Sequence, residues 1–379
     1  MKEYDVFIAG GGIAGSICAK YAAKGGLKTL FVEKYKTPRM KSCSGIQFGY
    51  FEKILGEKIP KEKLCTNEIN KVSMHLPNGK KMKAPFKMFN FMRDVFDDWL
   101  NQVGIENGAE FRDESSLVDW EEQKEYVIIT ISDKDKNTEK IKAKYLIDAT
   151  GMNSQVRKKM RPGDYKKRSS GATVNYYFKG VGDLDPKVLY QYWNMDFNNY
   201  MFAWVYNKSG LWVIGTGYDK EISKVGKRYF EYIKEEYNLE GEIVKKEGFS
   251  SNMDMSETRV NLGEGRIFFI GDTAGLVDMA RGVGMDAAAL SGRLAAKAII
   301  KTEHNGRKKK SAIDIYRNLM KKTVDQTVKN TGKGIHNLKD NDELMAYLKK
   351  SMLKMGMGMF FQNFFNKFRS AEKQTLLPP

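Results

Sequence analysis

The chain has 379 residues, of which 41% are hydrophobic and 29% charged, a composition that suits a folded protein with a substantial core and excludes a largely disordered one. Its three cysteines, Cys18, Cys43 and Cys65, predict a reducing compartment and no disulfide framework, and its three separated histidines predict no metal site. We expect neither a secretory leader nor a membrane-spanning helix. The net charge of +17 predicts either an anionic partner or a lysine-rich solvated surface.

Residues 4–32 have the pattern of a strand, a helix and a second strand. The apolar run 4–9 predicts a buried parallel strand, residues 16–24 a helix, and residues 27–32 the next strand. The intervening glycines form a G-x-G-x-x-G pattern, which permits a tight turn, close approach of a pyrophosphate and close packing of helix on strand. The carboxylate that ends the second strand can accept from an adenosine ribose hydroxyl. The unit predicts an adenine dinucleotide site, without separating FAD from NAD, at Gly10, Gly12, Ile13, Ala14, Gly15 and Glu33.

The middle of the chain contains mainly strand signals. Residues 72–76 and 80–82 predict a hairpin, residues 93–103 a helix, and residues 126–132 with 140–147 a second pair of strands. Residues 172–217 are aromatic and alternate as strands do when one face is turned to a core or a ligand. An α/β pattern then returns, with a strand over 266–270 and an alanine-rich helix over 285–300, and the chain after residue 306 is helical and basic.

Three separated motifs resemble those of the aromatic hydroxylase-like flavoproteins, a superfamily of two-domain FAD enzymes. They are the glycine pattern with Glu33, then Asp148-Ala149-Thr150-Gly151, then Gly271-Asp272-Thr273-Ala274-Gly275. The resemblance implies that FAD is the cofactor, that Asp272 binds its ribityl chain, and that Arg93 contacts its phosphates or ribityl chain. Taken as an isolated residue, Arg93 favours a position on a helix surface. The remaining implied contacts are Asp148, Gly151 and Gly271 in the motifs and Gly282, Val283 and Gly284 beside the flavin ring.

Within this superfamily, residues 4–300 resemble the geranylgeranyl reductase family, flavoenzymes that saturate isoprenoid double bonds. Residues 38–45 are similar to its early loop, in which a cysteine lies near the flavin, and residues 202–207 to its aromatic Tyr-x-Trp-x-Phe-Pro motif. Ser44, Phe202, Asn207 and Val283 depart from the family pattern. These departures affect the expected substrate more than the expected flavin.

An isolated double bond accepts hydride poorly, so an acid must protonate the other carbon. The resemblance places Cys43 at the flavin, where its thiol can be that acid, and a small buried side chain is the alternative interpretation. Trp204, Tyr206 and Tyr192 are candidates for substrate contact, and aromatic residues at this spacing also suit a core. Arg281, beside the flavin loop, suits either an anion contact or the surface.

The expected fold is α/β: a Rossmann-type FAD-binding domain, an inserted antiparallel β-sheet substrate domain and a C-terminal helical segment. The FAD-binding domain is expected from residues 1–71, 85–165 and 255–303, and the substrate domain from residues 72–84 and 166–254. Residues 304–379 form the basic helical region, with 16 basic and 6 acidic residues. Its lysines, methionines and phenylalanines predict contact with an anionic membrane surface, so we expect a cytoplasmic protein that is peripheral at the inner face of the membrane.

These observations predict an FAD-dependent oxidoreductase that reduces carbon–carbon double bonds of an isoprenoid or other lipid-like substrate. The alternative is an FAD-dependent monooxygenase acting on an aromatic or polyketide substrate, followed by a flavin halogenase, whose Trp-x-Trp-x-Ile-Pro motif is absent, and a noncatalytic electron carrier. Because no second dinucleotide fingerprint is present, the expected electron donor is either NADPH that visits the flavin or a ferredoxin-like partner protein. Nucleic acid is not expected, since the basic tail lacks an RNA-binding pattern.

Overall fold

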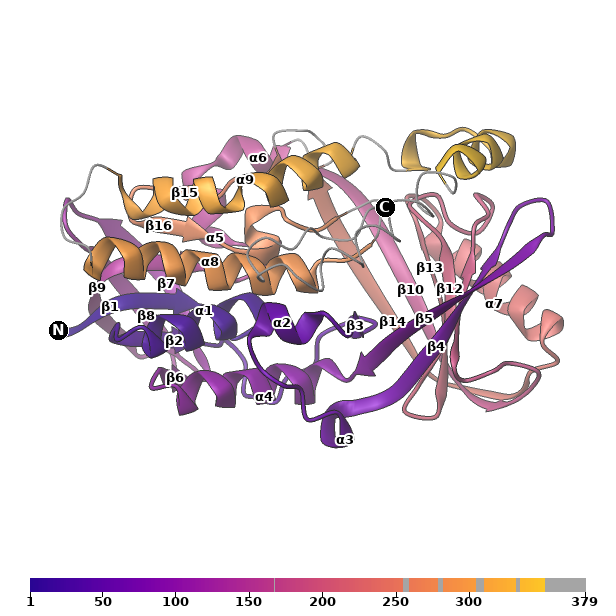
Figure 1. Cartoon of the computed structure of the whole chain (residues 1–379), viewed down its shortest axis with the longest axis horizontal. Helices are drawn as coiled ribbons and strands as arrows, with labels where there is room; N and C mark the ends of the chain where they lie inside the picture. The colour runs from indigo at the N-terminus through magenta and orange to yellow at the C-terminus, as the bar shows by residue number, and fades with distance from the viewer. Residues whose placement is uncertain (167, 255–258, 279–281, 305–309, 332–334, 352–379) are drawn as a thin grey trace.

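The strands of the protein form two eight-stranded sheets at opposite ends of the molecule (Figure 1). The computed structural model describes residues 1–166, 168–254, 259–278, 282–304, 310–331 and 335–351. Within these ranges the chain leaves the first sheet twice to build the second sheet and returns to the first sheet each time.

The first sheet is mainly parallel and has the order β15-β16-β9-β1-β2-β6, with β8 and then β7 joined antiparallel to β9. Its strands are β1 (Lys2–Ala9), β2 (Thr29–Val32), β6 (Glu110–Arg112), β7 (Ser115–Glu122), β8 (Val127–Asp133), β9 (Thr138–Asp148), β15 (Gly263–Glu264) and β16 (Ile267–Phe269). In β1, Val6, Phe7 and Ile8 are fully buried, because a parallel strand covered on both faces has no polar side. The strands expected over 4–9, 27–32, 126–132, 140–147 and 266–270 are confirmed.

Long helices pack side by side against this sheet: α4 (Arg93–Glu106), α1 (Ile13–Lys24), α8 (Met285–His304) and α9 (Ala312–Thr331) (Figure 1). Gly292 lets α8 approach α1 closely, since a Cβ on Gly292 would lie 2.2 Å from the carbonyl oxygen of Ala14. Shorter helices are α2 (Phe51–Leu55), α3 (Lys61–Leu64), α5 (Gln155–Met160) and α6 (Pro162–Lys166). The helices expected over 16–24, 93–103 and 285–300 are confirmed.

The second sheet has the order β14-β10-β13-β12-β11-β4-β5-β3 and is antiparallel except where β11 pairs with β4. Its strands are β3 (Ile46–Phe48), β4 (Cys65–His75), β5 (Lys81–Phe91), β10 (Arg168–Val181), β11 (Val188–Tyr192), β12 (Ala203–Lys208), β13 (Leu211–Tyr218) and β14 (Glu240–Asp254). The expected hairpin is confirmed and is longer than 72–82, because the alternation of buried residues continues outward to Ile69 and Met88.

The two faces of the second sheet differ. One face is covered by α7 (Ile222–Glu236), whose Tyr229, Phe230 and Ile233 join a buried cluster with inward residues of β10, β11, β12 and β13. The other face carries Tyr177, Trp204 and Tyr206 together with residues of β3, β4 and β5. Alternation along each strand therefore separates neighbouring side chains onto faces with different surroundings.

The sheets do not follow the expected segment limits in full. Residues 46–48, 65–71 and 85–91 pair in the second sheet, although the sequence limits placed them with the FAD-binding domain. The division of the chain into domains at the remaining limits stays a prediction. The consequence for the site is that the loop containing Cys43 leads directly into a strand of the second sheet.

The described part of the C-terminal region is helical and packs on both sheets. The hydroxyl of Tyr316 in α9 donates to the carbonyl oxygen of Phe269 at the first sheet. Residues 341–351 form a helix whose Leu344 and Leu348 pack with Leu76 and Trp193 at the second sheet. Most of the lysine, methionine and phenylalanine segment lies outside the described residues.

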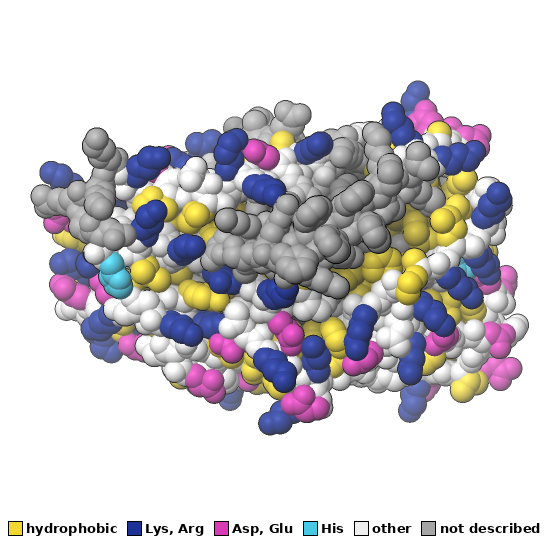
Figure 2. Space-filling view, in the orientation of Figure 1, with side chains coloured by type: hydrophobic (Ala, Val, Ile, Leu, Met, Phe, Trp, Pro, Cys, Tyr) yellow, Lys and Arg dark blue, Asp and Glu magenta, His cyan; other side chains and the backbone are white. Residues whose placement is uncertain are grey.

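Basic side chains are spread over the visible face of the molecule, and hydrophobic side chains gather beside the residues drawn in grey (Figure 2). None of the helices in the described ranges combines the length and the apolar composition that crossing a membrane requires.

Candidate active site

The turn between β1 and α1 leaves backbone exposed where the sequence predicts a pyrophosphate. A Cβ on Gly15 would lie 1.8 Å from the carbonyl oxygen of Gly10, so only glycine permits this packing. At Gly12, the one described atom within 4 Å of an added Cβ, apart from the adjoining backbone, is an Nη2 of Arg39 at 3.3 Å. Gly12 also begins α1 without a side-chain cap, so the helix N-terminus presents bare amides toward this space.

Glu33 lies at the end of β2 and anchors a chain of charges. Its carboxylate accepts from the backbone amides of Gly11 and Tyr35, both at 3.1 Å, and pairs with Arg39 at 3.0 Å. Arg39 also contacts Asp97 at 3.2 Å, and Asp97 receives two hydrogen bonds of 2.8 Å from Arg93. The predicted ribose carboxylate and the predicted Arg93 are thus connected through two residues that the sequence reasoning missed.

The motif at residues 148–151 braces a second loop of the site. Asp148 is fully buried and accepts from the amide and hydroxyl of Thr150 and from the hydroxyl of Ser154. Burial raises the pKa of Asp148, while the hydrogen bonds oppose that rise. Gly151 exchanges hydrogen bonds with Thr273 in the next motif, with distances of 2.8 and 3.1 Å. Asp148 therefore supports the loop from behind, and a Cβ added to partly buried Gly151 would meet no atom within 4 Å.

The third motif forms a short 3-10 turn, Gly271–Ala274, immediately before the start of α8. Asp272 is partly exposed and lies 3.8 Å from the ammonium group of Lys41. Asp278 and Val283 pair across the following loop, and Asp278 accepts from the side chain of buried Asn330 in α9 at 2.6 Å. A Cβ on Gly284 would lie 3.5 Å from Asp272, so the predicted residues of the loop and the turn do come together.

Buried Arg157 holds this turn from behind and had no distinguishing signal in the sequence. Its guanidinium donates to the carbonyl oxygens of Thr273 and Arg259, at 2.7 and 2.6 Å, and pairs with Asp164 at 2.9 Å. An arginine with three acceptors fixes backbone that has no regular partner of its own.

Cys43 lies where the two halves of the molecule meet. Its sulfur is 3.9 Å from the sulfur of Met285, the first residue of α8, and accepts from the amide of Gly45 at 3.4 Å. Burial acts to raise the pKa of the thiol, but the guanidinium of Arg93, the Gly45 amide and the ammonium of Lys208 together bring it below its ordinary value. The surroundings therefore stabilise the thiolate and make the thiol a stronger acid.

The aromatic face of the second sheet is built in rows. Asn175, Gly215 and Trp204 are aligned across β10, β13 and β12, and the indole of Trp204 donates to Asn175 at 2.8 Å. A Cβ on Gly215 would lie 2.3 Å from the indole nitrogen, so the ring crosses directly over this glycine. The spacing of the rows follows from the strand register.

The next row is formed by Tyr177, Val213 and Tyr206. The hydroxyl of Tyr177 donates to Glu247 at 2.9 Å. Burial raises the pKa of Tyr177 and of Tyr206 well above the ordinary value, with the neighbouring acidic groups adding to it. Both tyrosines consequently stay neutral, and Tyr177 gives its proton to the hydrogen bond with Glu247.

Two of the predicted substrate residues are not brought to this face by the described structure. Tyr192 projects to the opposite face, where it is buried under α7 and donates to Glu236 at 2.7 Å. The reason is that successive side chains of a strand point to opposite faces of the sheet. Tyr192 pairs with Ala203, whose side chain also lies in the cluster beneath α7. Trp204 and Tyr206 point to the other face. Arg281 lies outside the described residues.

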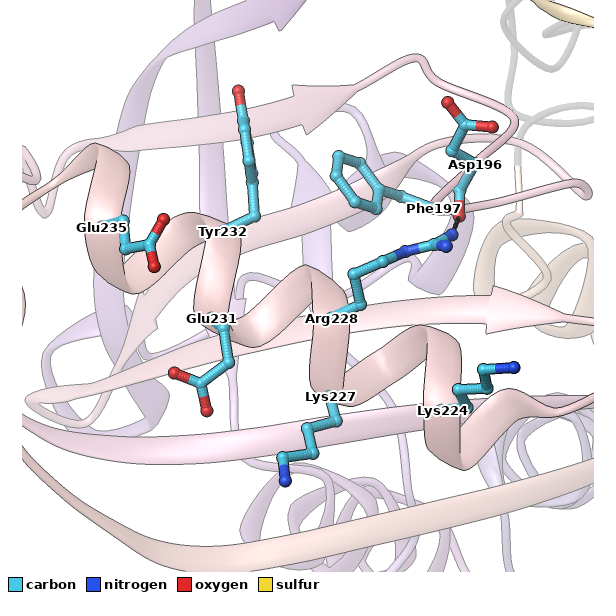
Figure 3. Close-up of a pocket in the computed structure, with 8 residues that line it drawn as sticks. All are labelled: Asp196, Phe197, Lys224, Lys227, Arg228, Glu231, Tyr232 and Glu235. Atoms are coloured by element: carbon cyan, nitrogen blue, oxygen red, sulfur yellow. Dashed lines mark hydrogen bonds between the residues drawn. The ribbon is translucent and has the colours of Figure 1, made fainter.

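A surface pocket lies away from these residues and is lined mainly by polar and charged side chains. Figure 3 shows it on the outer side of α7, with Arg228 reaching the backbone of Asp196 beside Phe197. Because α7 covers the face opposite Tyr206 and Lys208, this pocket is separated from Cys43 by the sheet.

Comparison with known proteins gives a family. The family model for the FAD binding domain matches residues 3–331 of the chain. The chain belongs to the FAD-binding domain family. A digeranylgeranylglycerophospholipid reductase of Methanosphaera stadtmanae is 24% identical over 339 residues, covering 81% of each chain. A chloroplastic geranylgeranyl diphosphate reductase of Arabidopsis thaliana is 26% identical over 333 residues, covering 81% of this chain and 68% of the relative.

Solved structures show the same fold. A geranylgeranyl bacteriochlorophyll reductase-like protein of Thermoplasma acidophilum has a TM-score of 0.79 at 22% identity, covering 91% of this chain and 90% of that one. A myxobacterial chondrochloren halogenase has a TM-score of 0.67 at 15% identity, covering 86% and 80%. The fold is therefore shared by flavoproteins with different chemistries.

The described residues fit the FAD that the family binds. The bare backbone of Gly12 and the uncapped start of α1 suit its pyrophosphate, and the position of Glu33 at the end of β2 suits its adenosine ribose. Partly exposed Asp272 and the start of α8 suit the ribityl chain and the ring. Asp148 does not add a ligand in this arrangement, because its bonds are directed to its own loop.

Proposed function

We propose that this protein is an FAD-dependent oxidoreductase that reduces carbon–carbon double bonds of an isoprenoid or other lipid-like substrate. The observation that carries the proposal is the position of Cys43, whose thiol touches the start of α8 and whose carbonyl oxygen accepts from Lys208 at the end of the aromatic strand β12. The reductase names of two relatives that cover 81% of the chain support the substrate class.

Bound and reduced FAD would supply hydride to one carbon of the double bond. The Cys43 thiol donates its proton from Sγ to the other carbon, so that one hydrogen pair is added and a thiolate is left. Arg93, the Gly45 amide and Lys208 stabilise that thiolate, and a proton from solvent restores the thiol. Arg93 keeps its charge throughout, since Asp97 accepts from Nε and Nη2 along one edge of its guanidinium.

The aromatic face of the second sheet binds the substrate in this proposal. Trp204 offers a large apolar surface that is fixed by Asn175, and Tyr206 adds a second ring on the same strand and face. Met201, in the loop before β12, contacts Gly282 of the flavin loop, where a Cβ would lie 1.9 Å from the methyl group. The loop that leads into β12 and the flavin loop are therefore in contact at this glycine.

The test is an anaerobic turnover with the holoenzyme. The flavin is reduced chemically, a geranylgeranyl lipid is added, and flavin reoxidation is followed by absorbance while the product is measured by mass spectrometry. We expect one added hydrogen pair for each saturated bond and no requirement for oxygen. Oxygen incorporation seen only in aerated samples would instead identify a monooxygenase, and absence of product in both would reject the substrate class.

The electron donor is proposed to be NADPH or a ferredoxin-like carrier, because the sequence contains no second dinucleotide fingerprint. Stopped-flow reduction of the oxidised holoenzyme by each donor separates the two. The proposed contact of residues 304–379 with an anionic membrane is tested by co-sedimentation with vesicles containing an anionic phospholipid at low and high salt, with zwitterionic vesicles as the control.

A further inference from the structure

Lys208, the last residue of β12, is a buried lysine that connects the second sheet to the loop of Cys43. Only 4% of Lys208 is exposed, and its Nζ donates to the carbonyl oxygens of Cys43 and Ser44, each at 3.0 Å. The two partners are 165 and 164 positions away in the chain, so this contact joins segments with no local connection. It is the direct link between the aromatic strand and the proposed proton donor.

The setting of Lys208 is unusual for a buried cation. No carboxylate of the described residues lies within ion-pair distance of its ammonium group, and Arg93 adds a second positive charge nearby. Burial, the main cause, and Arg93 lower the pKa of Lys208, whereas the Cys43 sulfur, Glu247 and Asp94 raise it. Because a buried charge is costly, the ammonium and the Cys43 thiolate favour each other.

The strand geometry explains why the lysine reaches this loop. Trp204, Tyr206 and Lys208 alternate along β12 and lie on the face opposite α7, where the first two contact the substrate in our proposal. Lys208 then extends beyond the last row and clamps the backbone on which the thiol is carried. The two charge-assisted hydrogen bonds therefore fix strand β12 relative to the loop that carries the Cys43 thiol.

We propose that Lys208 is a positioning residue, which fixes the Cys43 loop against β12 and stabilises the thiolate that Cys43 forms when it gives up its proton. The inference rests on the proposed function for its catalytic consequence. Its chemical consequence, the reactivity of the Cys43 thiol, is independent of the substrate.

The first measurement is alkylation of Cys43 by iodoacetamide as a function of pH, read by peptide mass spectrometry of the holoenzyme. In Lys208→Met we expect the midpoint of the profile to rise by about one pH unit, with roughly tenfold slower alkylation near neutral pH. Lys208→Arg retains the charge and is expected to keep the low midpoint. Lys179→Met changes an exposed lysine in β10 of the same sheet; it is the matched control and should leave the profile unchanged.

The second measurement is steady-state reduction of the lipid. Because Lys208 acts through Cys43 and not on the substrate, we expect Lys208→Met to lower kcat about tenfold with little change in KM. Lys208→Gln provides a second neutral variant that can still donate a hydrogen bond. FAD content and circular dichroism establish that each variant is folded.

The outcomes separate the two proposals. A wild-type alkylation profile in folded Lys208→Met and Lys208→Gln would overturn the role of Lys208, whatever the enzyme reduces. Failure of both neutral variants to fold would assign the lysine to the fold alone and also overturn the role. If the profile shifts as expected but the wild-type enzyme reduces no lipid, the positioning of Cys43 stands and the proposed function fails.

Discussion

The two sheets contribute to the site in different ways. The first sheet contributes backbone: Gly12, Gly15 and the start of α1 form a surface that needs only local spacing to be built. The second sheet contributes side chains whose positions depend on register, such as Trp204 and Tyr206 on one face and Tyr192 on the other. A cofactor site made from backbone can therefore be read from a short motif, whereas a substrate face made from register cannot.

The largest expected effect comes from adding one methyl group to the backbone of the cofactor site, at Gly15. Gly15→Ala places a Cβ 1.8 Å from the Gly10 carbonyl oxygen, so the loop must shift, at a cost of about 4 kcal/mol. Titration of the apoprotein with FAD, followed by flavin fluorescence, should show affinity lowered about a thousandfold. Gly163→Ala is the control, since its Cβ would meet nothing within 4 Å, and equal losses in both would reject the steric argument.

Replacing the thiol tests the junction between the sheets. Cys43→Ser is expected to lower kcat about a hundredfold, because serine is a far weaker acid, while FAD affinity stays near that of the wild type. The wild-type rate should fall as pH rises through the lowered pKa of Cys43, since the thiol is then already deprotonated. Cys65→Ser, a partly buried thiol in β4, is the control, and a hundredfold loss there would contradict the assignment.

Lowering the pH should decrease the free energy of unfolding through His75, a residue of the second sheet that is buried beneath α7. Burial is the main cause that lowers its pKa to about 4, and Glu236 opposes this while Lys81 and Lys83 add to it. The unfolded chain, with a pKa near 6.5, binds the proton first, so stability is lost as pH falls from 6.5 toward 4. By pH 5 the loss is about 2 kcal/mol.

Urea unfolding at pH 7 and pH 5, followed by tryptophan fluorescence, measures this loss. His75→Gln should remove about 2 kcal/mol of the difference between the two pH values, whereas exposed His304→Gln should not. The nearby groups Ser73, Tyr190, Tyr192 and Tyr237 remain in both variants. An unchanged pH difference in His75→Gln would show that carboxylates alone carry the acid sensitivity.

The smallest expected effect separates the two faces of the sheet. Trp204→Leu should raise KM for the lipid up to about tenfold, because apolar contact area is lost on the substrate face. Tyr192→Phe should leave KM unchanged and lower the free energy of unfolding by about 1 kcal/mol, since its hydroxyl loses Glu236 and Tyr237. Equal effects on KM would mean that the faces do not differ in function.

The sequence was sufficient for much of the fold and for part of the site. The strand, helix and strand at residues 4–32 could be predicted because each signal is local, and the same holds for the hairpin at Pro77-Asn78-Gly79. The placement of Tyr192 could not, since a list of aromatic residues does not state which face each occupies until strand pairing is known.

Other residues were missed for a related reason. Lys208 directly follows the quoted aromatic motif, and its alternation with Trp204 and Tyr206 was the one available signal. Its target, the backbone of Cys43, is fixed only by tertiary structure. Arg39 stood inside the quoted loop, but its contacts with Glu33 and Asp97 require three separate elements to meet.

The interleaving of the two sheets has a consequence for how the protein acquires its structure. The parallel contact of β4 with β11 joins residues more than a hundred positions apart, for example Val72 with Leu189. During synthesis the β4 edge of the β4–β5 hairpin therefore stays unpaired until β11 has left the ribosome. Folding should be slow and should depend on the whole chain being present, so that severing the polypeptide between β5 and β10 would leave two fragments that assemble only by association.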